Sequence, residues 1–134
     1  MRKLCVLLVV LMLSVVSCKE RTTDPMVIIN DFNNSGLECI NTTMVEKDDS
    51  YLPNVFEIGY RCEITKANNQ GLRVFYFSNP QDQDLVFNYY TNLPHMGGNA
   101  SHLYKSGDLL FQTEKKNIQY DLLINYLQIF EKYK

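Results

Sequence analysis

The sequence predicts an α+β fold, in which a mostly antiparallel sheet of about five strands carries three helices packed on one face. Two observations lead to this prediction. Apolar and polar residues alternate over 55–64, as in a strand with one buried and one wet face. Residues 118–133 instead repeat apolar side chains every three or four positions, as in an amphipathic helix. The expected order is helix, strand, strand, strand, helix, strand, strand, helix.

The first expected element is a helix that begins after residue 24. Asp24 suits the N-cap and Pro25 the first helical position, while Gly36 can end the helix in a left-handed conformation. Its apolar face is formed by Ile28, Ile29 and Phe32. A helix this short is not stable alone, so this face should dock on another element.

Strands are expected over 37–45, 55–64 and 72–78. The segment 46–53 is a charged loop, and Asn and Gly residues in 68–71 indicate a turn. The third strand is apolar on both faces and is therefore expected to be central in the sheet.

The second half of the chain supplies a helix, a hairpin and a closing helix. Asn79 and Pro80 open a helix that runs to about residue 92. Its expected inner stripe is Leu85, Val86, Tyr89 and Leu93. Segments 101–104 and 109–113 are expected to pair as a hairpin, and residues 118–133 form the last helix.

The N-terminus has the features of a secretory leader. A basic head, Met1 to Lys3, precedes an apolar run from Leu4 to Val16, which is shorter than the roughly twenty residues of a membrane-spanning helix. The run ends at Val15-Val16-Ser17-Cys18, which resembles the lipobox of bacterial lipoproteins over residues 1–18. The resemblance implies that the Cys18 thiol is acylated and that the leader is removed before it.

The expected organisation is therefore a signal peptide over 1–17, a lipidated N-terminus and tether over 18–24, and a single α+β domain over 25–134. An ordinary signal peptidase could also cut after Ser17. In addition, triplets beginning at Asn33, Asn41 and Asn99 match the glycosylation pattern. A secreted glycoprotein without a lipid anchor is thus an alternative.

Cysteine parity supports acylation and predicts one disulfide. Cys5 is lost with the leader, which leaves three cysteines in an oxidising compartment. If Cys18 is acylated, Cys39 and Cys62 can pair. The pairing conflicts with the strand pattern, because placing these cysteines directly opposite sets Met44 against Glu57. Either the two strands are not neighbours, or the first is shorter than 37–45.

The net charge of the mature chain limits the kinds of partner that it can bind. Loss of Arg2 and Lys3 from 13 basic residues leaves 11 against 15 acidic residues, a net charge of −4 for the mature chain. No basic stripe is present, so we expect no nucleic-acid partner. Attachment to the membrane should depend on the acyl chains rather than on charge.

No catalytic, cofactor or metal motif is evident, and we expect a protein that is not an enzyme. Asp82 and Asp84 are better explained by the first turn of a helix than by a calcium site. His95 and His102 lack zinc-ligand spacing. Tyr90 follows Tyr89 on a helix, so one ring should be exposed, and Tyr90 is the candidate protein contact.

These observations favour a lipid-anchored binding module at the outer face of a bacterial membrane, plasma or outer, with an envelope protein as a candidate partner. The layout from Leu72 to Tyr133 also resembles small, mostly uncharacterised lipoproteins of low-GC Gram-positive bacteria. Some lipoproteins of this general type block phage entry or redundant conjugation. A superinfection or conjugation exclusion (immunity) lipoprotein is therefore the alternative function.

Overall fold

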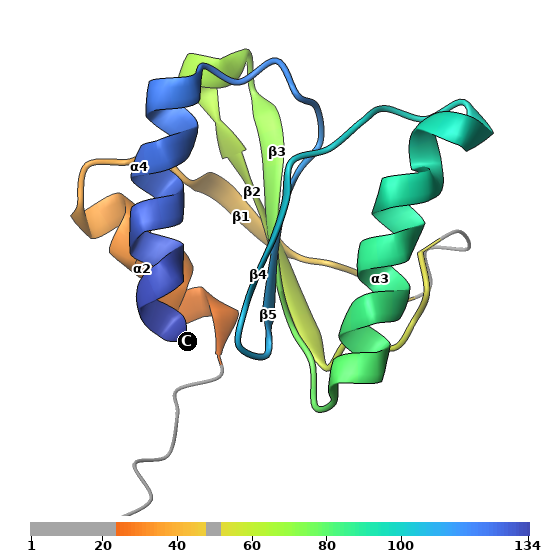
Figure 1. The fold of residues 1–134 in the computed structure, drawn as a ribbon. Helices are drawn as coiled ribbons and strands as arrows, with labels where there is room; N and C mark the ends of the chain where they lie inside the picture. The colour runs from red at the N-terminus through yellow and green to blue at the C-terminus, as the bar shows by residue number, and fades with distance from the viewer. Residues whose placement is uncertain (1–23, 48–51) are drawn as a thin grey trace, which may run out of the picture.

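The computed structural model describes residues 24–47 and 52–134, and the predicted leader and Cys18 lie outside these ranges. The described chain forms one five-stranded antiparallel sheet with three α-helices, so the α+β class and the element order are confirmed (Figure 1). The helices are α2 (Pro25–Asn34), α3 (Pro80–Asn92) and α4 (Tyr120–Phe130). The strands are β1 (Ile40–Met44), β2 (Ile58–Ile64), β3 (Gln70–Tyr76), β4 (Leu103–Ser106) and β5 (Leu109–Thr113). Within the described ranges, no helix has the length and apolar character needed to span a membrane.

The sheet is covered on both faces, so the expectation that all three helices share one face is wrong. The strand order is β1-β2-β3-β5-β4, with β3 in the centre. Leu72 and Val74 of β3 belong to the apolar cluster beneath α2 and α4, whereas Phe75 and Phe77 belong to the cluster beneath α3. A central strand that is apolar on both faces needs cover on both, and α3 supplies it on the second face (Figure 1).

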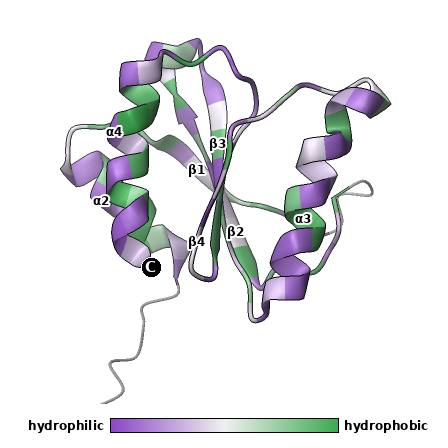
Figure 2. Ribbon diagram, viewed as in Figure 1, coloured by the Kyte–Doolittle hydropathy of each residue, from purple (hydrophilic) through white to green (hydrophobic). Residues whose placement is uncertain are grey.

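Each helix has one buried side, and Figure 2 shows hydrophobic and hydrophilic residues on all three. The buried residues of α4 are Leu123, Tyr126, Leu127, Ile129 and Phe130, which confirms most of the apolar stripe expected over residues 118–133. Leu122 and Tyr133, also expected in the stripe, are only partly buried. The stripe predicted for α3 is partly wrong. Val86 is buried, but Leu85 is 52% exposed, and Gln83 and Tyr90 are buried with Val86.

Both predicted helix starts are capped as expected. The Asp24 carboxylate accepts a hydrogen bond of 2.9 Å from the Met26 N–H. Asn79 Oδ1 accepts one of 2.9 Å from the Asp82 N–H, and Asn79 Nδ2 donates to Asp82 Oδ2 at 2.7 Å. The acidic first turn of α3 therefore completes its own cap, which accounts for Asp82 without a metal.

The predicted disulfide between Cys39 and Cys62 is present, with a Cα–Cα distance of 5.1 Å. Strands β1 and β2 are neighbours, and β1 begins only after Cys39, so the shorter strand resolves the predicted conflict. The register shifts between Ile40 and Thr43, where Asn41 has a φ of 52°. Because of this bulge, Met44 lies opposite Tyr60 rather than Glu57, while Ile40 lies opposite Glu63 at the edge of the sheet.

The segment before β1 is fixed by α2. Asn33 Nδ2 donates to the Cys39 carbonyl at 3.0 Å, and the Cys39 N–H donates to Asn33 Oδ1 at 3.0 Å. The side-chain amide of Asn33 thus makes the two hydrogen bonds with the Cys39 backbone that a residue of a neighbouring strand would make. The nitrogen that would carry a glycan in the triplet at Asn33 is already used to hold the fold.

The last hairpin is shifted relative to its prediction. Ser106 pairs with Leu109, so only Gly107 and Asp108 form the turn, and β4 extends to Ser106 instead of ending at residue 104. Buried Gln83 of α3 donates to the carbonyls of Gly107 and Leu109 at 3.0 and 2.9 Å. This contact ties α3 to the hairpin, and it depends on tertiary packing that local periodicity does not encode.

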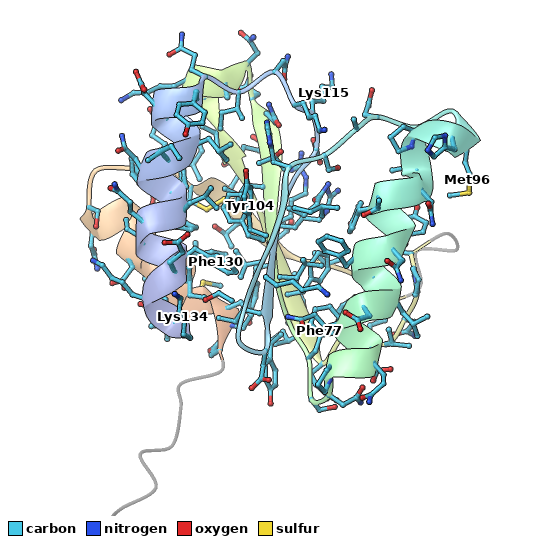
Figure 3. The ribbon with its side chains drawn as sticks, in the orientation of Figure 1. Phe77, Met96, Tyr104, Lys115, Phe130 and Lys134 are labelled. Atoms are coloured by element: carbon cyan, nitrogen blue, oxygen red, sulfur yellow. A yellow bond between two sulfur atoms is a disulfide. The ribbon has the colours of Figure 1, made fainter. Side chains whose placement is uncertain are left out.

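The two ends of the described chain lie close together. Figure 1 shows the start of α2, the C-terminus and the β4–β5 turn at one end of the molecule, which we call the tether end. Figure 3 shows Lys115 and Met96 at the opposite end, away from Lys134.

Candidate functional site

A cleft of about 700 Å³ lies between the C-terminal half of α3 and the sheet; we call it the α3 cleft. Its floor includes Arg61 of β2, Arg73 of β3 and Gln112 of β5. Tyr89, Tyr90 and Leu93 line it from α3 and the short 3₁₀ helix that follows. Residues 43–46 line it from β1 and the segment after it, and Lys115 lines it at the end away from the tether end (Figure 3).

The arginines reach the cleft through the period of two in β2 and β3. Arg61 pairs directly with Arg73, and Gly59 pairs with Phe75. Since alternate residues share a face, Arg61 and Arg73 lie on the same face as Phe75, which packs under α3. The face of β2 that was expected to be solvent-exposed is therefore covered by Phe75 at one end. The other end of this face is open and forms part of the α3 cleft.

One carboxylate joins the two arginines. Glu114 Oε1 lies 2.8 Å from Arg61 Nε and 3.1 Å from Arg73 Nη2. Its other oxygen accepts a hydrogen bond of 3.0 Å from the Gly71 N–H. Like charges placed directly across a strand pair destabilise a sheet, so Glu114 offsets the repulsion between the two guanidinium groups.

Neighbouring polar residues complete the network. Arg61 Nη1 lies 3.4 Å from Glu63 Oε1, and Asn41 Nδ2 donates to Glu63 Oε2 at 3.0 Å. Arg73 Nη1 donates to Gln112 Oε1 at 3.1 Å, and Gln112 Nε2 donates to Ser101 Oγ at 2.9 Å. The floor of the α3 cleft is thus held in place from β1 to the loop before β4.

Ionisation in this network follows from its hydrogen bonds. Burial alone would raise the pKa of Glu114, but the hydrogen bond from Arg61, the charge of Arg73 and the Gly71 N–H together lower that pKa below 4.5. The hydrogen bond to Glu114 raises the pKa of Arg61 above its ordinary value, against the opposing effect of burial. The hydrogen bond from Asn41, followed by that from Arg61, lowers the pKa of Glu63. Arg61 and both carboxylates are therefore charged at neutral pH.

Tyr90, the candidate protein contact, is not an exposed anchor, and this part of the prediction is wrong. Its side chain is only 6% exposed, and its ring lies 6.3 Å from that of Phe75 and 5.2 Å from that of Tyr89. The spacing of Gln83, Val86 and Tyr90 puts all three on the face of α3 that meets the sheet. Tyr90 therefore lines the α3 cleft while most of its side chain is buried between α3 and the sheet.

Neither His95 nor His102 lines the α3 cleft. His95 is exposed after α3, and His102 Nε2 lies 3.3 Å from the Lys116 carbonyl oxygen. Among residues 24–47 and 52–134, no group of three or more His, Cys, Asp or Glu side chains is arranged to hold a metal ion. Cys39 and Cys62 lie in the apolar core beneath α2 and α4, on the other side of the sheet from the cleft.

Sequence reasoning missed the three residues at the centre of this site: Arg61, Arg73 and Glu114. The alternation in β2 sets Arg61 apart from the buried residues, but the turn predicted at 68–71 implies a different register, because β3 begins at Gln70, which pairs with Ile64. Glu114 gave no comparable signal, since it lies 53 residues from Arg61 and just beyond the last strand.

Comparisons with protein-family models, with curated proteins and with solved structures give no match to this chain. The assignment of a function therefore depends on the residues of the α3 cleft and on the N-terminal motif.

Proposed function

We propose that this protein is a lipid-anchored protein of the bacterial envelope that binds a partner in the α3 cleft and is not an enzyme. Acylation of Cys18 would hold it at the outer face of the membrane. Support for the anchor comes from the lipobox-like sequence ending at Cys18 and from the disulfide between Cys39 and Cys62. With those two cysteines paired, Cys18 is the one mature thiol left for acylation.

The position of the chain start supports the α3 cleft as the binding surface. Helix α2 begins at the tether end, whereas Lys115, on the rim of the cleft, lies at the opposite end of the molecule (Figures 1 and 3). A domain attached through the short segment before Asp24 would therefore expose the α3 cleft away from the lipid surface. A partner in the envelope could reach it without displacing the anchor.

Binding fits the chemistry of the cleft better than catalysis does. A general acid or base that works near neutral pH needs a pKa close to 7, whereas the pKa of Glu114 is lowered by its arginine partners. An ionised carboxylate held by two guanidinium groups is a weak base. The single observation that carries the proposal is this fixed, charged floor beneath an open cleft.

Photo-crosslinking in intact cells tests both parts of the proposal. A crosslinking residue at Asn99, on the rim of the α3 cleft, should yield a discrete protein adduct in the membrane fraction. The same residue at Asp108, in the turn at the tether end, should not yield that adduct. The Cys18→Ser variant should leave the membrane fraction or accumulate as an uncleaved precursor. A mature Cys18→Ser protein that stays membrane-bound contradicts the anchor, and equal adducts from both positions contradict the cleft.

A further inference from the structure

We propose that the ligand of the α3 cleft is an extended peptide segment of about four residues whose carboxylate side chain binds Arg61 and Arg73. This inference rests on the proposed function, in that it takes the α3 cleft as the binding site. It adds the chemical class of the ligand and the residues that would recognise it.

The two arginines have unused donors beside the cleft. A guanidinium group carries five N–H donors. Arg61 makes two polar contacts, with Glu114 and Glu63, and Arg73 makes two, with Gln112 and Glu114. More than half of the donors of this pair thus have no acceptor in the described part of the chain. The side chains are 27% and 23% exposed, so an incoming acceptor can reach them.

Glu114 shows which chemical group fits between the arginines. One of its oxygens already contacts both guanidinium groups, at 2.8 and 3.1 Å. A ligand carboxylate would accept charged hydrogen bonds of the same planar geometry from the guanidinium N–H groups that have no acceptor among the described residues. The cleft is lined by three basic residues, Arg61, Arg73 and Lys115, and by two acidic ones, Glu46 and Glu114. It is therefore weakly basic within an acidic chain, which favours an acidic ligand.

The width of the cleft sets the length of the ligand. Its lining residues come from four successive strands in the sheet order, β1, β2, β3 and β5. Three spacings of about 4.8 Å give roughly 14 Å across these strands. An extended chain advances about 3.3 Å per residue, so roughly four residues cover this distance.

The wall of the cleft supplies an apolar contact next to the charged floor. Tyr89 and Leu93 line the α3 side, and Met44, which is 61% exposed, lines the β1 side. An aromatic or aliphatic ligand residue beside the acidic one could pack against these side chains. The combination of arginine with tyrosine is typical of peptide and protein recognition.

Titration with capped tetrapeptides tests the ligand class. The probes are acetyl-Ala-Glu-Phe-Ala-amide and the matched acetyl-Ala-Gln-Phe-Ala-amide, added to the full mature protein in detergent at constant ionic strength. Binding is followed by NMR through the arginine Nε–H signals. We expect the Glu peptide to shift the signals of Arg61 and Arg73 and to bind about tenfold more tightly than the Gln peptide, as a charged hydrogen bond requires. Inorganic phosphate at the same concentration should produce no comparable shift.

Two variants with opposite effects separate recognition from folding. Arg73→Gln should weaken binding of the Glu peptide about tenfold, while Lys66→Gln, which removes a charge outside the cleft, should leave it unchanged. Glu114→Gln should strengthen binding, because the internal carboxylate no longer competes for the arginines. A variant that only damaged the fold would weaken binding, so an increase for Glu114→Gln is specific to this proposal.

Several results would overturn the ligand class. These are equal binding of the Glu and Gln peptides, no binding of either, equal shifts with phosphate, or weaker binding by Glu114→Gln. If an adduct still forms at Asn99 in cells, the α3 cleft remains a binding site whichever of these results is obtained. Failure of the ligand class and failure of the proposed function can thus be told apart.

Discussion

Arg61 and Arg73 lie directly opposite each other on β2 and β3, and a single oxygen of Glu114 contacts both guanidinium groups. Two like charges in these positions would weaken the central strand pair without a counter-ion. Glu114 therefore has a structural effect on the sheet as well as a place in the α3 cleft. Its removal should affect stability and ligand binding in different directions.

Replacement of Glu114 by Gln should lower the free energy of unfolding by about 1 kcal/mol, because the amide cannot offset the charges of both arginines. Urea unfolding followed by circular dichroism measures the change. Glu57→Gln is the matched control, since Glu57 is exposed and makes no ion pair within the described residues. An equal loss in both variants would contradict a specific effect of Glu114.

The stabilising effect of Glu114 should disappear in acid. Its pKa is lowered in the folded protein, so the stabilisation is fully present above the ordinary value of 4.5 and is lost as the pH falls through the lowered pKa. Unfolding free energies of the wild type and of Glu114→Gln should therefore converge as the pH falls from 4.5 through the lowered pKa of Glu114. A difference that stays constant from pH 7 to pH 3 would show that the ion pair is not its source.

Replacement of Gly71 by Ala should displace the Glu114 carboxylate from the arginines. A Cβ atom at position 71 would lie 2.3 Å from Glu114 Cδ, and a flexible side chain can move away from it. We expect a destabilisation of about 1 kcal/mol and a rise in the pKa of Glu114 towards its ordinary value. A carboxyl-carbon NMR titration measures the pKa, with Ser78→Ala as the control. An unchanged pKa would contradict the displacement.

Replacement of Cys39 and Cys62 by Ala should lower the free energy of unfolding by about 3 kcal/mol, because the bond closes a loop with a sequence separation of 23. Chemical denaturation with and without dithiothreitol measures the effect. The reductant should destabilise the wild type and leave the double variant unchanged. Identical denaturation midpoints for oxidised wild type and double variant would count against the estimate.

Replacement of Asn33 by Ala should cost about 2 kcal/mol, since it removes both hydrogen bonds that hold the Cys39 backbone. The adjacent Asn34→Ala is the control, because Asn34 is exposed and its side chain makes no hydrogen bond within the described residues. Thermal unfolding compares the two. If Asn34→Ala is as destabilising as Asn33→Ala, the role assigned to the Asn33 amide is wrong.

Much of the fold could be predicted because its signals are local. The caps at Asp24 and Asn79 act within two or three residues, and the alternation in β2 and the stripe of α4 each repeat within a single element. Cysteine parity identified the disulfide without any knowledge of the strand register. These features together determined the class, the order of the elements and the bond between Cys39 and Cys62.

The tertiary structure alone decided the side of the sheet on which α3 packs, the burial of Tyr90 and the meeting of Glu114 with the arginines. Residues 83, 86 and 90 form the inner face of α3 because this helix packs over Phe75 and Phe77. These two rings lie on the face of the sheet opposite α2 and α4. Glu114 reaches Arg61 across 53 residues of sequence, a contact set by strand pairing rather than by local periodicity. The sequence therefore determined which elements form, while packing between distant elements determined where the α3 cleft lies, because such contacts leave no periodic trace in a single chain.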